Sequence, residues 1–296
     1  MATGMVLTNN GKKIVLNRSF KTTPDYSIVS TYQIGIGTTT PTGTDSGLEN
    51  KVPMDSTEAV DACDVTTGWT DSADMTLSVN STTYKENALS LNLTKDGTGS
   101  ATASTTKATT SLDFTSKDLS VWFYVADSTV LAQLATTSCV VIRFGSDSSN
   151  YYEWLKNASF FAVGWNLIRN LTSANADSTT GAPVLTACDY SYIATVATAA
   201  GQTWVAGKII MDDWKLADST DYTDEYETGF PLIDETALTV TTRGILSTSQ
   251  AAGYSLTEFG LFNTDSTPKL FSHMVHTAIT KTTSVQVIYV EVDEFV

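Results

Sequence analysis

The chain is poor in positive charge and in histidine. Its 296 residues include 17 Lys and Arg against 32 Asp and Glu, which gives a formal net charge of -15. Such a surface repels phosphate backbones and anionic lipid headgroups, so we expect neither a nucleic acid nor a membrane as partner. The only two histidines, His273 and His276, do not form a zinc signature, and no G-x-S-x-G, phosphate-loop or dinucleotide motif is present. The sequence therefore does not predict an enzyme.

Cysteines and long apolar runs are also scarce. The three cysteines, Cys63, Cys139 and Cys188, are odd in number and widely spaced, which argues against a disulfide framework and against a zinc motif. We expect them to be small buried side chains. The N-terminus, MATGMVLTNNGKK, has no apolar signal region, and no apolar run approaches the ~18 residues that span a bilayer. These features predict a soluble chain that is made in a cytoplasm.

Helix patterns are few and strand patterns are many. Charged residues make up only 17% of the chain, and Ser, Thr and Asn provide the polar surface instead, which suits strands and turns. Period-two alternation or short β-branched runs predict strands at 77–79, 89–93, 119–125, 139–144, 204–211, 237–242 and 285–292. Two short helices are predicted, at Gly11–Arg18 after a Thr-Asn-Asn cap and at Thr129–Leu134. The fold class predicted is all-β.

Two turn-rich or acidic segments, 38–56 and 218–229, divide the chain. All six tryptophans lie between them and none lies outside. A composition shift of this kind is typical of one domain inserted into a loop of another. We therefore expect residues 1–56 and 219–296 to form one split β domain with a short N-terminal helix, because each piece is too small for a core of its own. Residues 57–218 are expected to form an inserted β-sandwich.

Three motifs lie in the two outer segments of the chain: LTNNGKK from Leu7, YQIGIGTTTP from Tyr32, and LTEFGLF from Leu256. With these motifs in this order, the split domain resembles the N-terminal module of bacteriophage tail-collar and tail-fibre proteins. The resemblance implies a virion protein, assembled in the host cytoplasm, that docks on the particle and forms a homo-oligomer, with the trimer as the usual state of fibre-like proteins. Alternation in the last motif predicts a sandwich core or, alternatively, an interchain contact. The interface candidates are Phe259, Phe262 and Phe271.

The inserted block contains four further motifs: VTTGW from Val65, YKENALSLNL from Tyr84, DLSVWFY from Asp118, and GKIIMDDWKL from Gly207. With these motifs it resembles carbohydrate-binding-module jelly rolls. In such modules, acidic residues of the first and last strands often meet at a calcium site. The resemblance therefore implies calcium ligands among Asp61, Asp64, Asp212 and Asp213, helped by carbonyls near Asn87. Strand alternation sends Asp212 and Asp213 to opposite faces, so at most one of these two is expected to bind.

A sugar platform needs aromatic rings for the C–H faces of the sugar, and amides or carboxylates for its hydroxyl groups. One stretch of the inserted block offers such a set, with two further residues close by in sequence. The candidates are Tyr151, Tyr152, Glu153, Trp154, Trp165 and Asn166. Alternation alone requires about half of these rings to be buried, so core packing is the competing interpretation.

Three functions remain open from the sequence. The first is a tail collar, baseplate or short fibre component that docks on a phage particle and presents a glycan-binding jelly roll. The second is a capsid decoration protein or head fibre. The third is a virion-associated polysaccharide-degrading enzyme, for which paired carboxylates would have to come from scattered loop residues. We expect the first of these, a protein that works by adhesion and assembly.

Overall fold

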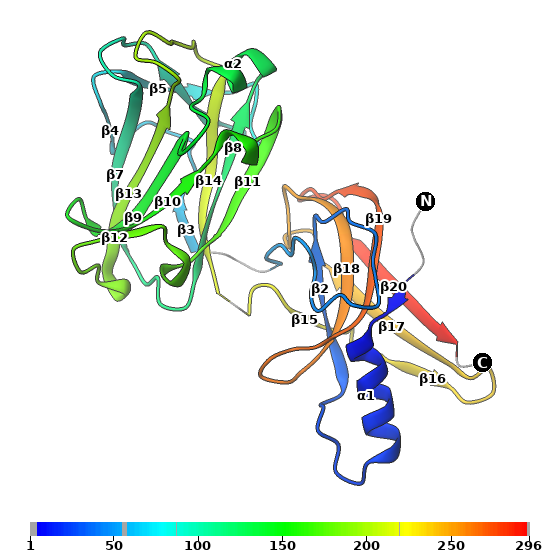
Figure 1. Cartoon of the computed structure of the whole chain (residues 1–296). Helices are drawn as coiled ribbons and strands as arrows, with labels where there is room; N and C mark the ends of the chain where they lie inside the picture. The colour runs from blue at the N-terminus through cyan, green and yellow to red at the C-terminus, as the bar shows by residue number, and fades with distance from the viewer. Residues whose placement is uncertain (1–4, 55–57, 87, 219, 295–296) are drawn as a thin grey trace. The chain divides into compact units, whose positions relative to one another are not determined.

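The computed structural model of the chain describes residues 5–54, 58–86, 88–218 and 220–294. The chain forms two compact units (Figure 1). Unit 1 comprises residues 1–56 and 219–296, and unit 2 comprises residues 57–218. Residues 55–57 and 219, where the chain passes between the units, lie outside the described residues. Strands form nearly all of the regular structure in both units, as the composition predicts. None of the described helices is long and apolar enough to cross a membrane.

Unit 2 contains two antiparallel sheets. The first sheet has the order β12 (Ser178–Thr180), β10 (Asn150–Lys156), β9 (Val140–Asp147), β13 (Cys188–Val196), β7 (Thr102–Leu112) and β4 (Trp69–Asp71). The second has the order β11 (Gly164–Leu171), β8 (Asp118–Val125), β14 (Ile209–Ala217), β6 (Ser90–Lys95) and β5 (Met75–Asn80), and β3 (Glu58–Asp61) also pairs with β14. Because β3 pairs with β14, the beginning and the end of the unit lie side by side.

The two sheets of unit 2 enclose one hydrophobic core. Alternate residues of strands from both sheets contribute to it, as in a β-sandwich. The ring of Phe114, which follows β7, lies edge-on against Phe144 and Trp154, with centroid distances of 5.2 and 6.1 Å. A short helix, α2 (Ser128–Gln133), and three 3-10 turns, Ala158–Phe160, Ser173–Asn175 and Leu185–Ala187, connect the strands. All three cysteines are buried and unpaired, as expected.

Unit 1 also contains two sheets. The larger has the order β1 (Val6–Leu7), β19 (Leu270–Thr280), β18 (Ser255–Asn263), β2 (Val29–Gly35) and β15 (Asp224–Glu225). The smaller has the order β16 (Leu232–Asp234), β17 (Thr239–Leu246) and β20 (Val287–Glu294). Phe259 of the larger sheet stacks on Tyr289 of the smaller at 4.4 Å and also contacts Tyr32 at 5.8 Å. The strands of unit 1 therefore come from both ends of the chain.

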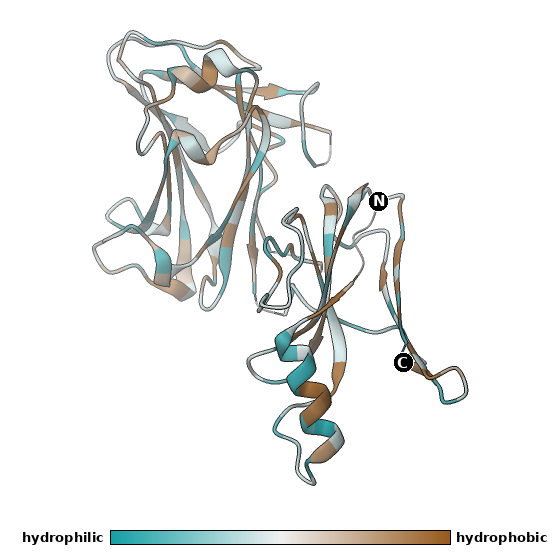
Figure 2. Cartoon of the chain, turned by 45° about the vertical axis from the view of Figure 1, so that its right-hand side comes forward, coloured by the Kyte–Doolittle hydropathy of each residue, from teal (hydrophilic) through white to brown (hydrophobic). Residues whose placement is uncertain are grey.

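The helix of unit 1, α1 (Asn9–Phe20), begins two residues earlier and ends two residues later than the sequence predicts. Thr8 caps it, because its Oγ1 accepts the N–H of Gly11 at 3.0 Å. The helix packs on β19, and Gly11 permits this approach, since a Cβ atom there would lie 2.2 Å from the carbonyl oxygen of Phe271. Hydrophobic and hydrophilic bands alternate along the helix in Figure 2, and Phe20 at its end is 82% exposed.

Several predictions about elements are wrong in detail. Residues 204–208 were expected in a strand but form a loop, and β14 begins only at Ile209. The interface role of Phe259 and Phe262 is also wrong, because both rings are at most 3% exposed within unit 1, where they fill its core. Phe271 is half-buried at the start of β19, where its carbonyl oxygen accepts the N–H of Thr8.

Candidate functional site

Three tyrosines, an arginine and a glutamate share the outer face of the first sheet of unit 2. We call this set the tyrosine face: Arg143, Tyr151, Glu153, Tyr190 and Tyr192. The register places them in two rows across strands β10, β9 and β13. Tyr151, Gly145 and Tyr190 form one row, and Glu153, Arg143 and Tyr192 form the next. The five side chains are therefore direct neighbours, although they come from positions up to 49 residues apart in the sequence.

Strand alternation explains why these side chains point outward. Their neighbours Ile142, Phe144 and Ile193 are fully buried and belong to the core. Because successive side chains of a strand point to opposite faces, the residues between them must face away from the core. The tyrosine face is thus held by a rigid sheet whose other side is packed.

Arg143 holds the tyrosine face together. Its guanidinium carbon lies 4.4 Å from the ring centroid of Tyr192 and 4.6 Å from that of Tyr151, so it contacts both rings by cation–π interaction. Its Nε donates to Oε2 of Glu153 at 2.7 Å, and the hydroxyl group of Ser178 donates to the other carboxylate oxygen at 3.2 Å. These contacts fix the two rings and the carboxylate in one arrangement before any ligand arrives.

Gly145 lets the first row come together. A Cβ atom at this position would lie 2.2 Å from the carbonyl oxygen of Asn150 and 2.5 Å from Cα of Tyr151, at the bulge where β9 and β10 change register. With no side chain between them, the rings of Tyr151 and Tyr190 approach to a centroid distance of 6.1 Å. A glycine at position 145 is therefore required for the rings of Tyr151 and Tyr190 to lie this close together.

Burial and neighbouring charges shift the pKa values of two of these groups. Burial alone would lower the pKa of Arg143, but its bond to Glu153 and its charge interactions with Glu153, Tyr192 and Tyr151 together outweigh that effect, and the pKa is raised. Burial raises the pKa of Tyr190, and the adjacent Arg143 opposes this only in part. At neutral pH the face therefore presents a charged guanidinium group beside the neutral phenol group of Tyr190. Aromatic rings with hydroxyl, guanidinium and carboxylate groups between them provide the contacts that a sugar needs.

The structure separates the six sequence-predicted glycan residues. Tyr151 and Glu153 belong to the tyrosine face. Tyr152 packs against the core, and Trp154 is buried within it, with its indole nitrogen donating to Oδ1 of Asn175 at 3.1 Å. These two were wrongly predicted to face a ligand, because alternation sends them to the opposite side of β10 from Tyr151 and Glu153.

The other two predicted residues lie on the second sheet. Trp165 of β11 contacts Trp122 and Tyr124 of β8, with centroid distances of 6.5 and 5.2 Å. The side chain of Asn166 bonds to the backbone of Phe123, Ala162 and Gly164, so its amide holds a turn. The expectation that both share one platform with Tyr151 and Glu153 is wrong.

Sequence reasoning missed Arg143, Tyr190 and Tyr192. A signal was present, because Tyr190 and Tyr192 are spaced i, i+2 with Ser191 between them and Ile193 after them. Two tyrosines at that spacing on a strand share one face. Only the pairing of β13 with β9 brings them beside Arg143, and that pairing is not visible in the sequence.

The four predicted calcium ligands do not form one cluster. Asp61 pairs with Lys107, and Asp213 pairs with Lys215 at 2.6 Å. Asp64 and Asp212 each keep a buried carboxylate oxygen with no hydrogen-bond partner, and so does Glu86. Asn87, near which carbonyl ligands were expected, lies outside the described residues. Within the described ranges, no group of three or more His, Cys, Asp or Glu side chains is arranged to hold a metal ion.

Burial strongly raises the pKa of two of these groups, Asp212 and Asp213, of which only Asp212 keeps an unpartnered oxygen. Its other oxygen, Oδ2, accepts the backbone N–H groups of Lys85 and Glu86 at 2.7 and 3.0 Å. Burial raises its pKa to about 7, although these two bonds oppose the shift. Near pH 7, such a carboxyl group is either protonated or charged at a cost in free energy that a nearby cation would reduce.

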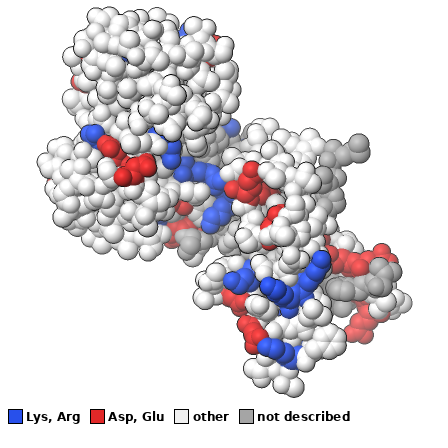
Figure 3. All heavy atoms as spheres, viewed as in Figure 1, with Lys and Arg blue, Asp and Glu red and all other residues white. Residues whose placement is uncertain are grey.

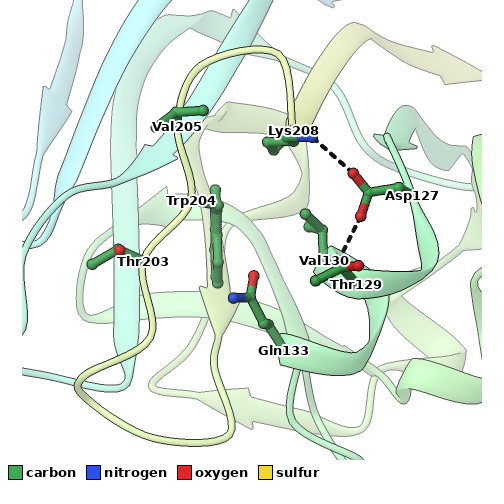
Figure 4. Close-up of a pocket in the computed structure, with 8 residues that line it drawn as sticks. All are labelled: Asp127, Thr129, Val130, Gln133, Thr203, Trp204, Val205 and Lys208. Carbon is green, nitrogen blue, oxygen red and sulfur yellow. Dashed lines mark hydrogen bonds and ion pairs between the residues drawn. The ribbon is translucent and has the colours of Figure 1, made fainter.

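A pocket of about 340 Å³ lies in unit 2 between α2 and the loop that precedes β14 (Figure 4). Trp204 forms one wall, the amide group of Gln133 lies beside it, and Lys208 pairs with Asp127 at 2.8 Å on the other side. Trp204 is only 4% exposed, and its indole nitrogen donates to the carbonyl oxygen of Leu93. The ring therefore offers a sugar much less surface than the tyrosine face does.

No protein-family model matches the chain, and no curated protein matches it. Among solved structures, it is similar to the family 11 carbohydrate-binding module from Clostridium thermocellum in complex with a β-1,3-1,4-mixed-linked tetrasaccharide, at 12% identity and a TM-score of 0.38 over 54% of this chain and 95% of that one. It is also similar to TmCBM61 in complex with β-1,4-galactotriose, at 12% identity and a TM-score of 0.31 over 52% and 90%. An exo-β-agarase matches at 11% identity and a TM-score of 0.38, over 57% of this chain and 25% of that one.

Proposed function

We propose that unit 2 is a glycan-binding domain and that the tyrosine face is its binding surface. The observation that carries this proposal is the placement of three tyrosine rings, a guanidinium group and a carboxylate on the open side of one sheet. The rings match the C–H faces of sugar units, and the two charged groups match their hydroxyl groups. Arg143 and Glu153 neutralise each other by pairing at 2.7 Å. A neutral polysaccharide suits such a surface. Lys, Arg, Asp and Glu also gather in clusters on the side of the molecule drawn in Figure 3.

Binding by substituted proteins tests this proposal. Soluble bacterial and plant polysaccharides are screened with the full chain by affinity electrophoresis, and the Kd of any ligand is then measured by calorimetry. Tyr192→Ala is expected to weaken binding about tenfold or more, which corresponds to about 1.4 kcal/mol. Tyr84→Ala is the matched control, because Tyr84 is a 44% exposed tyrosine on the loop between β5 and β6 of the same unit. Equal affinities for the two variants would reject the tyrosine face.

We propose further that unit 1 docks the chain on a bacteriophage particle, as a tail collar, baseplate or short fibre component. The support for this is the ordered set of three motifs at Leu7, Tyr32 and Leu256, all of which belong to unit 1. Several copies on one particle would convert weak glycan contacts into useful avidity. Immunogold labelling of particles tests the placement: gold on the tail supports it, gold on the head favours a capsid decoration protein or head fibre, and no gold rejects a virion role.

The mechanism proposed is retention of the ligand without turnover. Incubation of the full chain with a bound polysaccharide distinguishes it from a degrading enzyme. We expect no new reducing ends and no fall in polysaccharide mass. Release of oligosaccharides that is lost in carboxylate-to-amide variants would instead support the enzyme.

A further inference from the structure

The small sheet of unit 1 exposes an unusual strand edge. No described strand pairs with the second edge of β20, whose only partner is β17. The strand has eight residues, VIYVEVDE, with no lysine, proline or glycine. Soluble proteins commonly protect an edge of this length with lysine, proline or a bulge, because its unpaired N–H and C=O groups are a template for another strand. β20 has no lysine, proline or register shift, and its charged residues are the acidic Glu291, Asp293 and Glu294.

The outer side of the same strand is apolar and exposed. Ile288, Val290 and Val292 are 43%, 58% and 58% exposed, whereas Val287, Tyr289 and Glu291 between them are each 6% exposed and face the larger sheet. On the neighbouring strands, Leu232 is 55% exposed on the same side. Contiguous exposed apolar side chains on a sheet mark an interaction site.

We propose that β20 pairs with β20 of a second copy of this chain, antiparallel and about a two-fold axis at Val290. Each small sheet of three strands then becomes half of a continuous sheet of six. A two-fold axis requires that the surface be complementary to itself, and the sequence of β20 satisfies this. With the axis at Val290, Ile288 of each copy lies opposite Val292 of the other, so every exposed apolar side chain of the strand has an apolar partner.

The acidic residues select this register. With the axis at Val290, Glu291 lies opposite Tyr289 and Asp293 opposite Val287, so no two carboxylates face each other. An axis at Glu291 would place the two Glu291 side chains together, and an axis at Val292 would place Glu291 opposite Asp293. Directly opposed like charges destabilise a strand pair. An axis at Tyr289 avoids these contacts but pairs only residues 287–291 of the strand, against 287–293 in the proposed register.

Cysteine cross-linking of the full chain tests the register. Val290→Cys is expected to form a covalent dimer under mild oxidation, because a residue on the axis lies opposite itself at a Cα separation of about 4.5–5.5 Å. Ile288→Cys and Val292→Cys are each expected to cross-link poorly alone and well when mixed. The three natural cysteines are buried, so they contribute little background. Self-cross-linking of Ile288→Cys or Val292→Cys in preference to Val290→Cys would overturn the proposed register.

The mass in solution tests the association itself. Light scattering after size exclusion, at tens of micromolar, is expected to give the mass of two chains of 31.8 kDa each. Val290→Lys is expected to give one chain with an unchanged far-UV spectrum. The matched control is Ile233→Lys, because Ile233 is 70% exposed on β16, at the opposite edge of the same sheet, and this variant should remain dimeric. A single-chain mass for the unsubstituted protein, or a trimer, would overturn the proposal, and neither result bears on glycan binding by unit 2.

Discussion

At the residue scale, Asp212 contributes to the pH dependence of unit 2. Its pKa is about 7 in the folded chain, because burial disfavours the charged form, against 3.8 for an ordinary aspartate. A carboxyl group whose folded pKa is raised costs stability as pH rises above its unfolded pKa, and the full cost is reached once pH exceeds the folded pKa. The stability of unit 2 should therefore fall between about pH 4 and pH 7 on account of this residue.

Asp212→Asn should raise the stability of unit 2 at pH 8. The amide keeps an oxygen for the N–H groups of Lys85 and Glu86 and removes the buried charge, a gain of up to roughly 4 kcal/mol at about 1.4 kcal/mol per pKa unit. The gain should shrink toward pH 4, where the carboxyl group is protonated in both states. Thermal unfolding at several pH values measures it. Asp113→Asn is the control, because Asp113 is exposed and its pKa is lowered by hydrogen bonds with Thr115, so its substitution should bring no gain.

Calcium offers a second way to neutralise this region. We propose that a cation at Asp64 and Asp212 would relieve the unpartnered buried oxygens there, and the midpoint of thermal unfolding should then rise with millimolar calcium and fall with chelator. Asp212→Asn should remove most of that response. Equal midpoints for the unsubstituted chain with calcium and with chelator would contradict a calcium site.

His273 should give unit 1 the opposite pH dependence. Burial disfavours its charge, but its ring nitrogens bond to Glu258 at 2.9 Å and to Asp45 at 2.7 Å, and the net effect raises its pKa above 6.5. A histidine of this kind contributes stability that is fully present below pH 6.5 and is lost as pH rises through its folded pKa. Urea unfolding followed by far-UV circular dichroism should show His273→Gln to be most destabilised relative to the unsubstituted chain near pH 6, and less so at pH 9.

His276→Gln is the matched control for this experiment, because His276 is the only other histidine and its Nε2 lies 3.0 Å from the hydroxyl oxygen of Tyr289. A destabilisation by His273→Gln that stays constant between pH 6 and pH 9 would mean that the charge of His273 does not hold the contacts to Glu258 and Asp45.

At the scale of elements, the sequence predicts a strand well where apolar and polar residues alternate. β20 is an example, since Val287, Tyr289 and Glu291 face inward and the residues between them face outward. β7, with the sequence TASTTKATTSL, was missed because its core-facing residues include Thr105, which is polar yet fully buried. The hydroxyl group of Thr105 is satisfied by donating to the carbonyl oxygen of Thr70 on the neighbouring strand β4, at 3.3 Å, so its burial does not depend on hydrophobicity.

The candidate site was only partly predictable for a related reason. In β10, both alternating sets contain aromatic rings, Tyr151 on one side and Tyr152 and Trp154 on the other. The strand alone does not reveal which set faces the core, because a shift of one residue exchanges the two faces. The core is identified by residues distant in sequence, such as Phe114, which contacts Tyr152 and Trp154.

Substitution of the residue that caps α1 should cause a measurable loss of stability. Thr8 is fully buried, accepts the N–H of Gly11, and donates to the carbonyl oxygen of Leu270. Thr8→Ala should therefore lower the free energy of unfolding of unit 1 by about 1–2 kcal/mol, since it removes the cap and leaves buried backbone groups without a partner. Thr8→Ser keeps the hydroxyl group and should lose less. Equal losses for the two variants in urea unfolding would mean that packing of the methyl group, and not the hydroxyl group, is what matters.

At the scale of the whole molecule, the tryptophans allow the two units to be observed separately. All six lie in unit 2, while unit 1 contains only tyrosine and phenylalanine as aromatic residues. Tryptophan fluorescence therefore reports the unfolding of unit 2 alone, and far-UV circular dichroism reports both units. Because each unit has its own pair of sheets, we expect denaturant curves from the two probes not to coincide.

The same reasoning predicts that unit 2 folds without unit 1. Its first and last strands pair directly, with Asp61 opposite Trp214 and Glu58 opposite Leu216, so cutting the chain on both sides of the unit leaves its sheet closed. A fragment of residues 57–218 should reproduce the fluorescence transition of the full chain, including its response to pH through Asp212. It should also bind any polysaccharide that the full chain binds, and the Kd per tyrosine face should be similar in the fragment and in the full chain. If the fragment lacks a cooperative transition, then unit 2 depends on unit 1 for its stability, and the glycan-binding domain would have to be defined within the intact chain.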